Sequence, residues 1–302
     1  METASLQILG EVLNYYDVLE SIHLDANVSQ KIYLGKEPKK CRFCIEPDVT
    51  FNNDAHAFPE FISNKFLLSH HECDTCNTHF GETVETHMAN FMQVSHAVSG
   101  TKGKKNKIPK YQRSGIALNS NGNHIDIKNV DVESLSDKQF AINLTNPAFV
   151  PIAVYKCLTK MALTLIPEEE LLYFSNTIDW IKEKHHNNST YTFDKLISIY
   201  SYSPNAFPFV SAILLKRKKN VQNNFPYVIF RLTYSNFSFQ SYLPLCTLDQ
   251  AQSYNSDQIL YVPHLTDITR GLMISEKEFV DFNVTELITT NTTRLEITNL
   301  DK

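Results

Sequence analysis

Two matched pairs of cysteines constrain this chain more than any other feature. Four of its six cysteines form two Cys-x2-Cys pairs, Cys41 with Cys44 and Cys73 with Cys76. Two thiolates at this spacing can reach one ion from a tight turn, and two such pairs complete the tetrahedral sulfur set of a structural zinc site. We therefore predict one structural zinc ion held by all four. A thioredoxin-like redox pair would leave the second pair unexplained.

The composition is that of a chain that folds around a buried core. Hydrophobic residues make up 42% and charged residues 20% of 302 residues, and this length favours two domains. No apolar run approaches the ~20 residues of a membrane span, and the first residues lack the positive segment of a signal peptide. We expect a soluble cytoplasmic protein that does not bind membranes, with Cys157 and Cys246 as ordinary core thiols.

One short segment carries a concentrated positive charge. The formal net charge is −5, yet residues 102–113 hold six basic residues and no acid; the other 22 basic and 33 acidic residues alone would give −11. A basic run in an acidic chain favours a local contact with nucleic-acid phosphates. A solvated linker between domains is the alternative. The candidate phosphate-binding residues are Lys102, Lys104, Lys105, Lys107, Lys110 and Arg113.

Hydrophobic periodicity predicts helices and strands on both sides of this segment. Apolar residues at helical spacing favour an amphipathic helix over residues 6–24, packed on its own domain or on a partner chain. Further helices are expected over 77–91, 149–165 and 168–184. Aromatic and β-branched runs predict strands over residues 30–34, 49–51, 115–118, 124–127, 209–216, 227–234, 237–243 and 258–262.

The 28 residues between the two cysteine pairs exceed what a simple zinc ribbon needs. They contain the run Asp-Ala-His-Ala-Phe-Pro-Glu at positions 54–60. A hairpin held at its base by zinc would carry His56 to a fixed place opposite the helix that starts near Cys76. This ββα arrangement leaves room for one divalent cation between the hairpin and the helix.

The motifs CRFC, AHAFPEFISNK and CDTCNTHFG, which fall within residues 41–92, resemble the HNH endonuclease family. The resemblance is to its zinc-pinned subgroup, whose members occur among bacterial phage-defence effectors. It implies a ββα-metal fold in which His56 is the general base and Asn64 braces the hairpin. It also implies that Asn77 is a ligand of a catalytic Mg²⁺ or Mn²⁺ ion. Capping of the helix by Asn77 and a simple turn at Asn64 are the alternatives.

The chain departs from the family pattern at one position. The family usually has an acidic metal ligand immediately before the histidine, where this chain has Ala55. Asp54 is the replacement ligand we predict for the catalytic cation, and Glu60 is the other oxygen donor nearby. The resemblance thus implies an α+β chain in which a zinc-stabilised HNH domain precedes a mixed α/β domain. The expected divisions are an N-terminal helix and strand (1–40), the nuclease domain (41–100), a basic linker (101–114) and the C-terminal domain (115–302).

The leading hypothesis is a metal-dependent endonuclease that hydrolyses DNA phosphodiester bonds as an antiviral effector. Its C-terminal domain would regulate the nuclease or form oligomers. The partners expected besides DNA are a second copy of the chain and a defence-system protein. The competing hypothesis is a zinc-stabilised nucleic-acid-binding module that lost cleavage when the acidic ligand became Ala55. A nuclease released by a ligand or partner bound to the C-terminal domain is a third hypothesis and rests on analogy.

Overall fold

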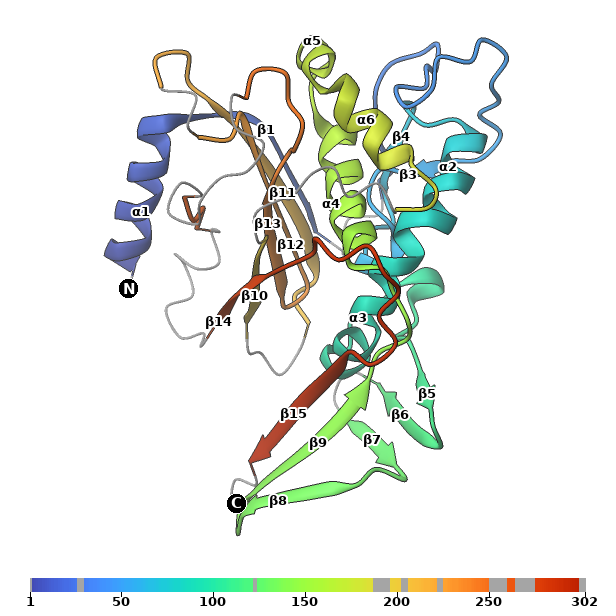
Figure 1. Ribbon diagram of the computed structural model, residues 1–302, viewed down its shortest axis with the longest axis vertical. Coiled ribbons are helices and arrows are strands. Elements are labelled where there is room, and N and C mark those ends of the chain that lie inside the picture. Colours follow the sequence, from blue (N-terminus) through green and yellow to red (C-terminus); the bar gives the residue numbers. More distant parts are fainter. Residues whose placement is uncertain are drawn as a thin grey trace.

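The computed structural model describes residues 2–25, 30–121, 124–186, 196–201, 206–221, 225–249, 260–263 and 275–298. Within these ranges the chain is a mixed α/β structure, as the sequence predicts, with one six-stranded sheet and three three-stranded sheets. None of the described helices is long and apolar enough to cross a membrane. Figure 1 shows the six-stranded sheet on one side and a narrow arm below. On the other side lie the elements around the paired cysteines, residues 32–99, which we call the zinc region after the predicted ion.

The six-stranded sheet is antiparallel throughout, in the order β1-β11-β12-β13-β10-β14. The two central strands, β12 and β13, are buried along their whole length, as expected of strands covered on both faces. The buried helix α4 (Pro151–Leu165) covers one face, and α1 (Glu2–Tyr15) lies on the other side (Figure 1). The strands are β1 (Tyr16–Asp25), β10 (Leu196–Ser201), β11 (Phe209–Arg217), β12 (Val228–Tyr234), β13 (Phe237–Tyr242) and β14 (Ser275–Val280).

The helix predicted over residues 6–24 is wrong in its second half. Helix α1 ends at Tyr15, and the chain continues as β1, which pairs with β11 about 190 residues later. Tyr16 is fully buried and donates a hydrogen bond to the Pro226 carbonyl at 2.8 Å. Pairing with a distant strand therefore overrides the local helical spacing, as tertiary context often does. The N-terminal segment consequently shares a sheet with the C-terminal half.

The zinc region contains three short strands followed by a long helical run. The sheet order is β2 (Ile32–Leu34), β4 (Leu67–Ser69), β3 (Ala55–His56), with β3 and β4 antiparallel. The 3-10 turn η1 (Glu60–Ile62) lies between β3 and β4. Then come α2 (Asp74–Phe80), the π-helical turn η2 (Gly81–Glu85) and α3 (Thr86–Ser99), so the expected helix forms. The strand predicted over 49–51 does not form.

The other predicted helices and strands are confirmed in part. Helix 149–165 is α4, whereas 168–184 is broken into α5 (Glu168–Leu171), η4 (Leu172–Phe174) and α6 (Ser175–Lys182). The strands expected over 30–34, 115–118, 124–127, 209–216, 227–234 and 237–243 are confirmed. Of 258–262, residues 260–262 are not in a strand, and 258 and 259 lie outside the described residues. Cys157 and Cys246 are buried, as predicted.

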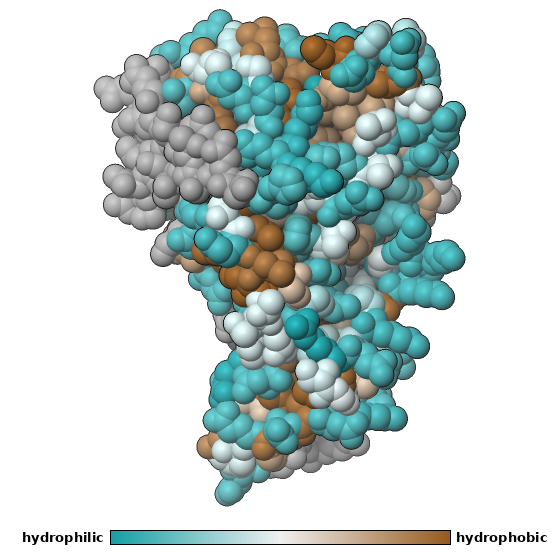
Figure 2. Space-filling model, turned by 45° about the vertical axis from the view of Figure 1, so that its right-hand side comes forward, coloured by the Kyte–Doolittle hydropathy of each residue, from teal (hydrophilic) through white to brown (hydrophobic). Residues whose placement is uncertain are grey.

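The narrow arm consists of two small sheets that extend from the end of α3 (Figure 1). A core cluster that includes Val94 of α3 and Leu118 anchors it. In the space-filling view, hydrophilic residues cover most of the visible face and apolar residues form small separate patches (Figure 2). The arm strands are β5 (Tyr111–Arg113), β6 (Ile116–Ser120), β7 (Ile125–Lys128), β8 (Val132–Ser136), β9 (Gln139–Thr145) and β15 (Thr292–Thr298).

A single arginine ties the zinc region to the end of α4. Arg42 lies between the first two zinc-site cysteines, and its side chain is 4% exposed. Its Nη1 donates to the carbonyls of Leu163, Thr164 and Ile166 at 2.6, 3.2 and 3.0 Å. The last carbonyls of a helix have no partner within the helix, and a cation there also complements the helix dipole. Arg42 thus caps α4 from the neighbouring module.

We expect Arg42→Met to lower the free energy of unfolding by about 2–4 kcal/mol, because it removes charged hydrogen bonds and leaves buried carbonyls without donors. Urea unfolding followed by circular dichroism measures the change. The matched control is Arg294→Met, whose exposed ion pairs with Glu133 and Glu296 should matter little. Equal effects of the two substitutions would contradict the capping role of Arg42.

Candidate functional site

The four paired cysteines converge on one point. Their sulfur atoms all lie within 4.8 Å of one another, and the Sγ atoms of Cys44 and Cys73 are 3.7 Å apart. A tetrahedral zinc site with Zn–S bonds of about 2.3 Å places its sulfurs about 3.8 Å apart. Cys44 is half-buried and the other three are buried. The donor set and its spacing therefore fit a closed, structural zinc ion.

The helix that begins at the second cysteine pair also fixes the start of the insert. Cys73 is the residue before α2, and Cys76 lies in its first turn. The Asp74 carboxylate accepts hydrogen bonds from the Thr50 hydroxyl at 2.5 Å and from the backbone amides of Asn52 and Asn53 at 2.9 and 3.0 Å. These bonds hold the pKa of Asp74 well below its usual range. These hydrogen bonds order residues 50–53, where the sequence predicts a strand over 49–51.

His56 lies on the hairpin at the end of β3. The register pairs it with Leu68 of β4, and the next amide, that of Ala57, donates to the Leu67 carbonyl at 3.1 Å. The imidazole is half-buried, and burial lowers the pKa of His56, although the charges of Glu60 and Glu85 oppose the shift. A lowered pKa keeps the ring neutral at neutral pH. A neutral imidazole is the form that accepts a proton.

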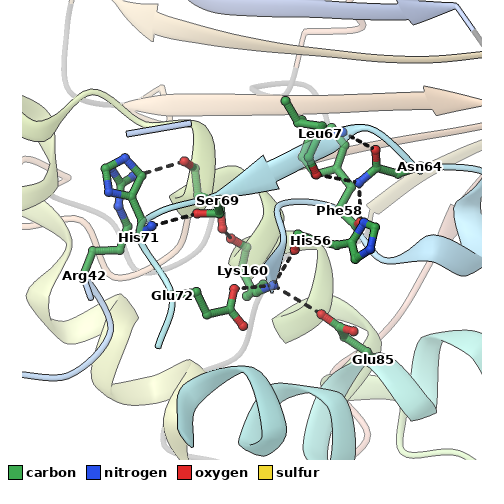
Figure 3. Close-up of polar contacts among 11 residues, drawn as sticks. Arg42, His56, Phe58, Asn64, Leu67, Ser69, His71, Glu72, Glu85 and Lys160 are labelled. Atoms are coloured by element: carbon green, nitrogen blue, oxygen red, sulfur yellow. Dashed lines mark hydrogen bonds and ion pairs between the residues drawn. The ribbon is translucent and has the colours of Figure 1, made fainter. Parts of the chain in front are cut away.

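Asn64 binds both ends of the loop that joins the two hairpin strands. Its side chain is 1% exposed, and its Nδ2 donates to the carbonyls of Phe58 and Leu67 at 2.6 and 3.0 Å. Its Oδ1 accepts from the Leu67 amide at 3.0 Å (Figure 3). The amide group therefore clamps the chain just after His56 to the start of β4. This is far more than the simple turn that was the alternative interpretation.

The two predicted metal ligands lie in different surroundings. Asn77 is half-buried within α2, and because Cys73 precedes the helix, the capping alternative for Asn77 is wrong. The Asp54 carboxylate lies 2.8 Å from Lys31 Nζ and 3.4 Å from the Tyr33 hydroxyl. Lys31 holds the pKa of Asp54 below its usual range. Asp54 therefore forms an ion pair with the ammonium group of Lys31.

Three charged side chains next to His56, two of them buried and one partly exposed, are not predicted from the sequence. Lys160 Nζ of α4 lies 2.8 Å from Glu72 Oε2 and 3.2 Å from Glu85 Oε1. It also donates to the His56 carbonyl at 3.5 Å (Figure 3). The available signal was the lysine itself, since a charge within an otherwise apolar helix calls for a partner. The partners could not be found because they are about 75 and 88 residues away.

The basic segment lies against the hairpin loop. Its five lysines are exposed, and Arg113 is half-buried on β5. Residues 104–106 form the short 3-10 turn η3 (Lys104–Asn106). Ser63 donates to the Lys102 carbonyl at 2.9 Å, and Lys65 Nζ donates to Asn106 Oδ1 at 2.6 Å. The exposed lysines therefore belong to a segment that is hydrogen-bonded to the loop that Asn64 clamps.

No protein-family model, curated protein or solved structure matches this chain.

We expect the purified protein to contain about one zinc ion per chain, and Cys73→Ser to lose it along with most of the soluble yield. The reason is that binding free energy at a structural zinc site is also folding free energy. Mass spectrometry of the metal content measures this. The matched control, Cys246→Ala, changes a buried thiol outside the cluster and should keep the zinc. Wild-type protein without zinc would contradict the assignment.

Proposed function

We propose that this chain is a metal-dependent HNH endonuclease that hydrolyses DNA phosphodiester bonds. The observation that carries the proposal is the clamp by Asn64, which binds the chain on both sides of the hairpin loop next to His56. This is the bracing role that the family resemblance implies for that residue. The predicted zinc cluster, which joins the base of the same insert to α2, supports it. A role in antiviral defence rests on the resemblance alone.

In this proposal His56 acts as the general base. The neutral imidazole takes a proton from a water molecule, whose oxygen attacks the phosphorus atom. The bond to the 3′-oxygen then breaks, and that oxygen leaves with the bonding electrons and is protonated by solvent. The burial that lowers the pKa of His56 keeps the base in its reactive form at neutral pH. The zinc ion takes no part in these steps because all four of its positions are filled by sulfur.

A divalent cation such as Mg²⁺ or Mn²⁺ would supply charge neutralisation at the leaving oxygen. Asn77 is the amide donor proposed for it. Asp54 is the carboxylate proposed for it, and cation binding there would have to displace the exposed Lys31 ammonium, 2.8 Å away. Glu60 is the other oxygen donor near the hairpin, and its charge, like that of Asp54, acts on His56.

The second candidate function is a nucleic-acid-binding module without cleavage. Two observations favour it: Ala55, which stands at the usual ligand position, is 2% exposed and packed in the core, and Asp54 is paired with Lys31. The exposed lysines beside the hairpin loop would serve binding equally well in either case. Incubation of plasmid, single-stranded DNA and RNA with Mg²⁺ or Mn²⁺ separates the two functions. Cleavage supports the endonuclease, and binding without cleavage supports the module.

We expect His56→Ala to lower the cleavage rate by at least about 100-fold, because it removes the proton acceptor. Binding to DNA and zinc content should stay unchanged, since no cysteine ligand or basic residue is lost. Plasmid nicking and filter binding measure these quantities. The control is His124→Ala, an exposed histidine on the arm side, which should cleave normally. Wild-type activity in His56→Ala would exclude His56 as the base.

We expect replacement of Lys104, Lys105 and Lys107 by Gln to weaken DNA binding and to lower the slope of log K against log salt by about 2–3 units. The variant makes fewer phosphate contacts and therefore releases fewer counterions when it binds DNA. Its sequence preference should not change, because phosphate contacts carry no base information. Binding isotherms at several salt concentrations measure the slope. The control replaces the exposed Lys128, Lys138 and Lys219 by Gln and alters the net charge equally. The same slope in both variants would return residues 102–113 to the role of a linker.

A further inference from the structure

Helix α4 carries two lysines at positions that are otherwise apolar or small. All of its residues are buried, and the side chains of Lys156 and Lys160 are 1% and 0% exposed. Removing an ammonium group from water is costly, and apolar residues of similar volume often serve a core equally well or better. Packing alone therefore does not explain why these two buried positions are lysines.

Lys160 contacts three separate parts of the candidate site. Its ammonium meets Glu72 just before the second cysteine pair and Glu85 at the end of η2. It also donates to the His56 carbonyl on the hairpin (Figure 3). In addition, it packs 5.8 Å above the centre of the Phe80 ring. One side chain thus joins the strand that carries the proposed base to the helix opposite it.

The charges in this network keep the lysine protonated. Burial alone would lower the pKa of Lys160, but the two carboxylates raise it above its ordinary value. Two carboxylates against one ammonium leave one excess negative charge when all three are ionised. Glu85 is the member that reaches the surface, with a side chain 22% exposed. Burial also raises the pKa of Glu72 to about 7, and Glu85 is the carboxylate of the pair whose charge acts on His56.

We propose that Lys160 is a positioning residue for His56, supplied by α4 from outside the zinc region; this inference rests on the proposed function. Its ammonium fixes the His56 carbonyl and the Glu85 carboxylate relative to each other. The position of the His56 side chain is therefore fixed relative to η2, which carries Glu85. A misplacement of about 1 Å at a reacting group can lower a rate by about 100-fold.

Lys156 offers a matched control on the same helix. It lies one turn earlier, is equally buried, and pairs with Glu183 at 3.2 Å instead of with the hairpin. Its ammonium also packs 5.2 Å above the centre of the Trp180 ring. Loss of either lysine removes a buried ion pair from α4, but only Lys160 contacts His56.

The test compares Lys160→Met with Lys156→Met in full-length, zinc-loaded protein, with rates expressed per folded molecule. We expect kcat for plasmid cleavage to fall at least about 30-fold in Lys160→Met while KM changes less than about 3-fold. In Lys156→Met both should stay within about 3-fold of the wild type. Similar kcat values in the two variants would overturn the inference and leave the proposed function standing.

A second variant covers the case in which Lys160→Met does not fold, because it leaves Glu72 buried without a partner. Glu72→Gln combined with Lys160→Met removes both buried charges and should show the same loss of kcat. Normal kcat in a folded double variant would overturn the inference.

Hydrogen exchange at the Ala57 amide provides a readout that does not depend on activity. We expect exchange to be at least about 10-fold faster in Lys160→Met than in Lys156→Met, because the hairpin opens more easily. If the wild type cleaves no nucleic acid, the proposed function and the effect of Lys160 on cleavage both fail. Faster exchange would then support hairpin positioning by Lys160, and equal exchange would overturn that as well.

Discussion

The convergence of four cysteines is the constraint on which the candidate site depends. The two hairpin strands, β3 and β4, contain two and three residues, too few to be stable by themselves. A zinc ion at the four sulfurs would join the loop before the insert to the start of α2 and so close the insert at its base. Asn64 within the insert and Asp74 at the start of α2 then replace regular strand pairing with side-chain hydrogen bonds. A short hairpin ordered in this way can hold one side chain at a fixed place without a large core of its own.

Helix α4 connects this insert with the rest of the chain through two oppositely directed contacts. Arg42 reaches from the zinc region to the carbonyl end of α4, and Lys160 reaches from α4 back to the hairpin. On its other side α4 packs against the six-stranded sheet, where the Tyr155 hydroxyl donates to the Tyr242 carbonyl at 3.0 Å. The same hydrophobic cluster includes Phe43 beside the zinc site and Phe230 of the central strand. The hairpin is therefore supported by the sheet as well as by the predicted zinc.

Local chemistry was readable from the sequence, whereas long-range pairing was not. The cysteine spacing predicted the cluster of four sulfurs, and apolar or β-branched runs predicted α4 and the strands β11 to β13, because these signals depend on neighbouring residues. The helical spacing of residues 16–24 does not indicate strand β1, because its partner β11 lies far along the chain. The pairing of Asp54 with Lys31 and the network around Lys160 were invisible for the same reason. The sequence pattern also gave no function for the six-stranded sheet.

The most direct test of the account is a metal titration of nuclease activity. Zinc-loaded wild-type protein, freed of other divalent cations, is mixed with supercoiled plasmid, and Mg²⁺ or Mn²⁺ is then added in steps while the zinc content is followed. The account predicts no cleavage with zinc alone and cleavage that rises to saturation with the added cation while zinc stays at about one per chain. Binding of DNA with no cleavage of DNA or RNA at any concentration of either cation would contradict it.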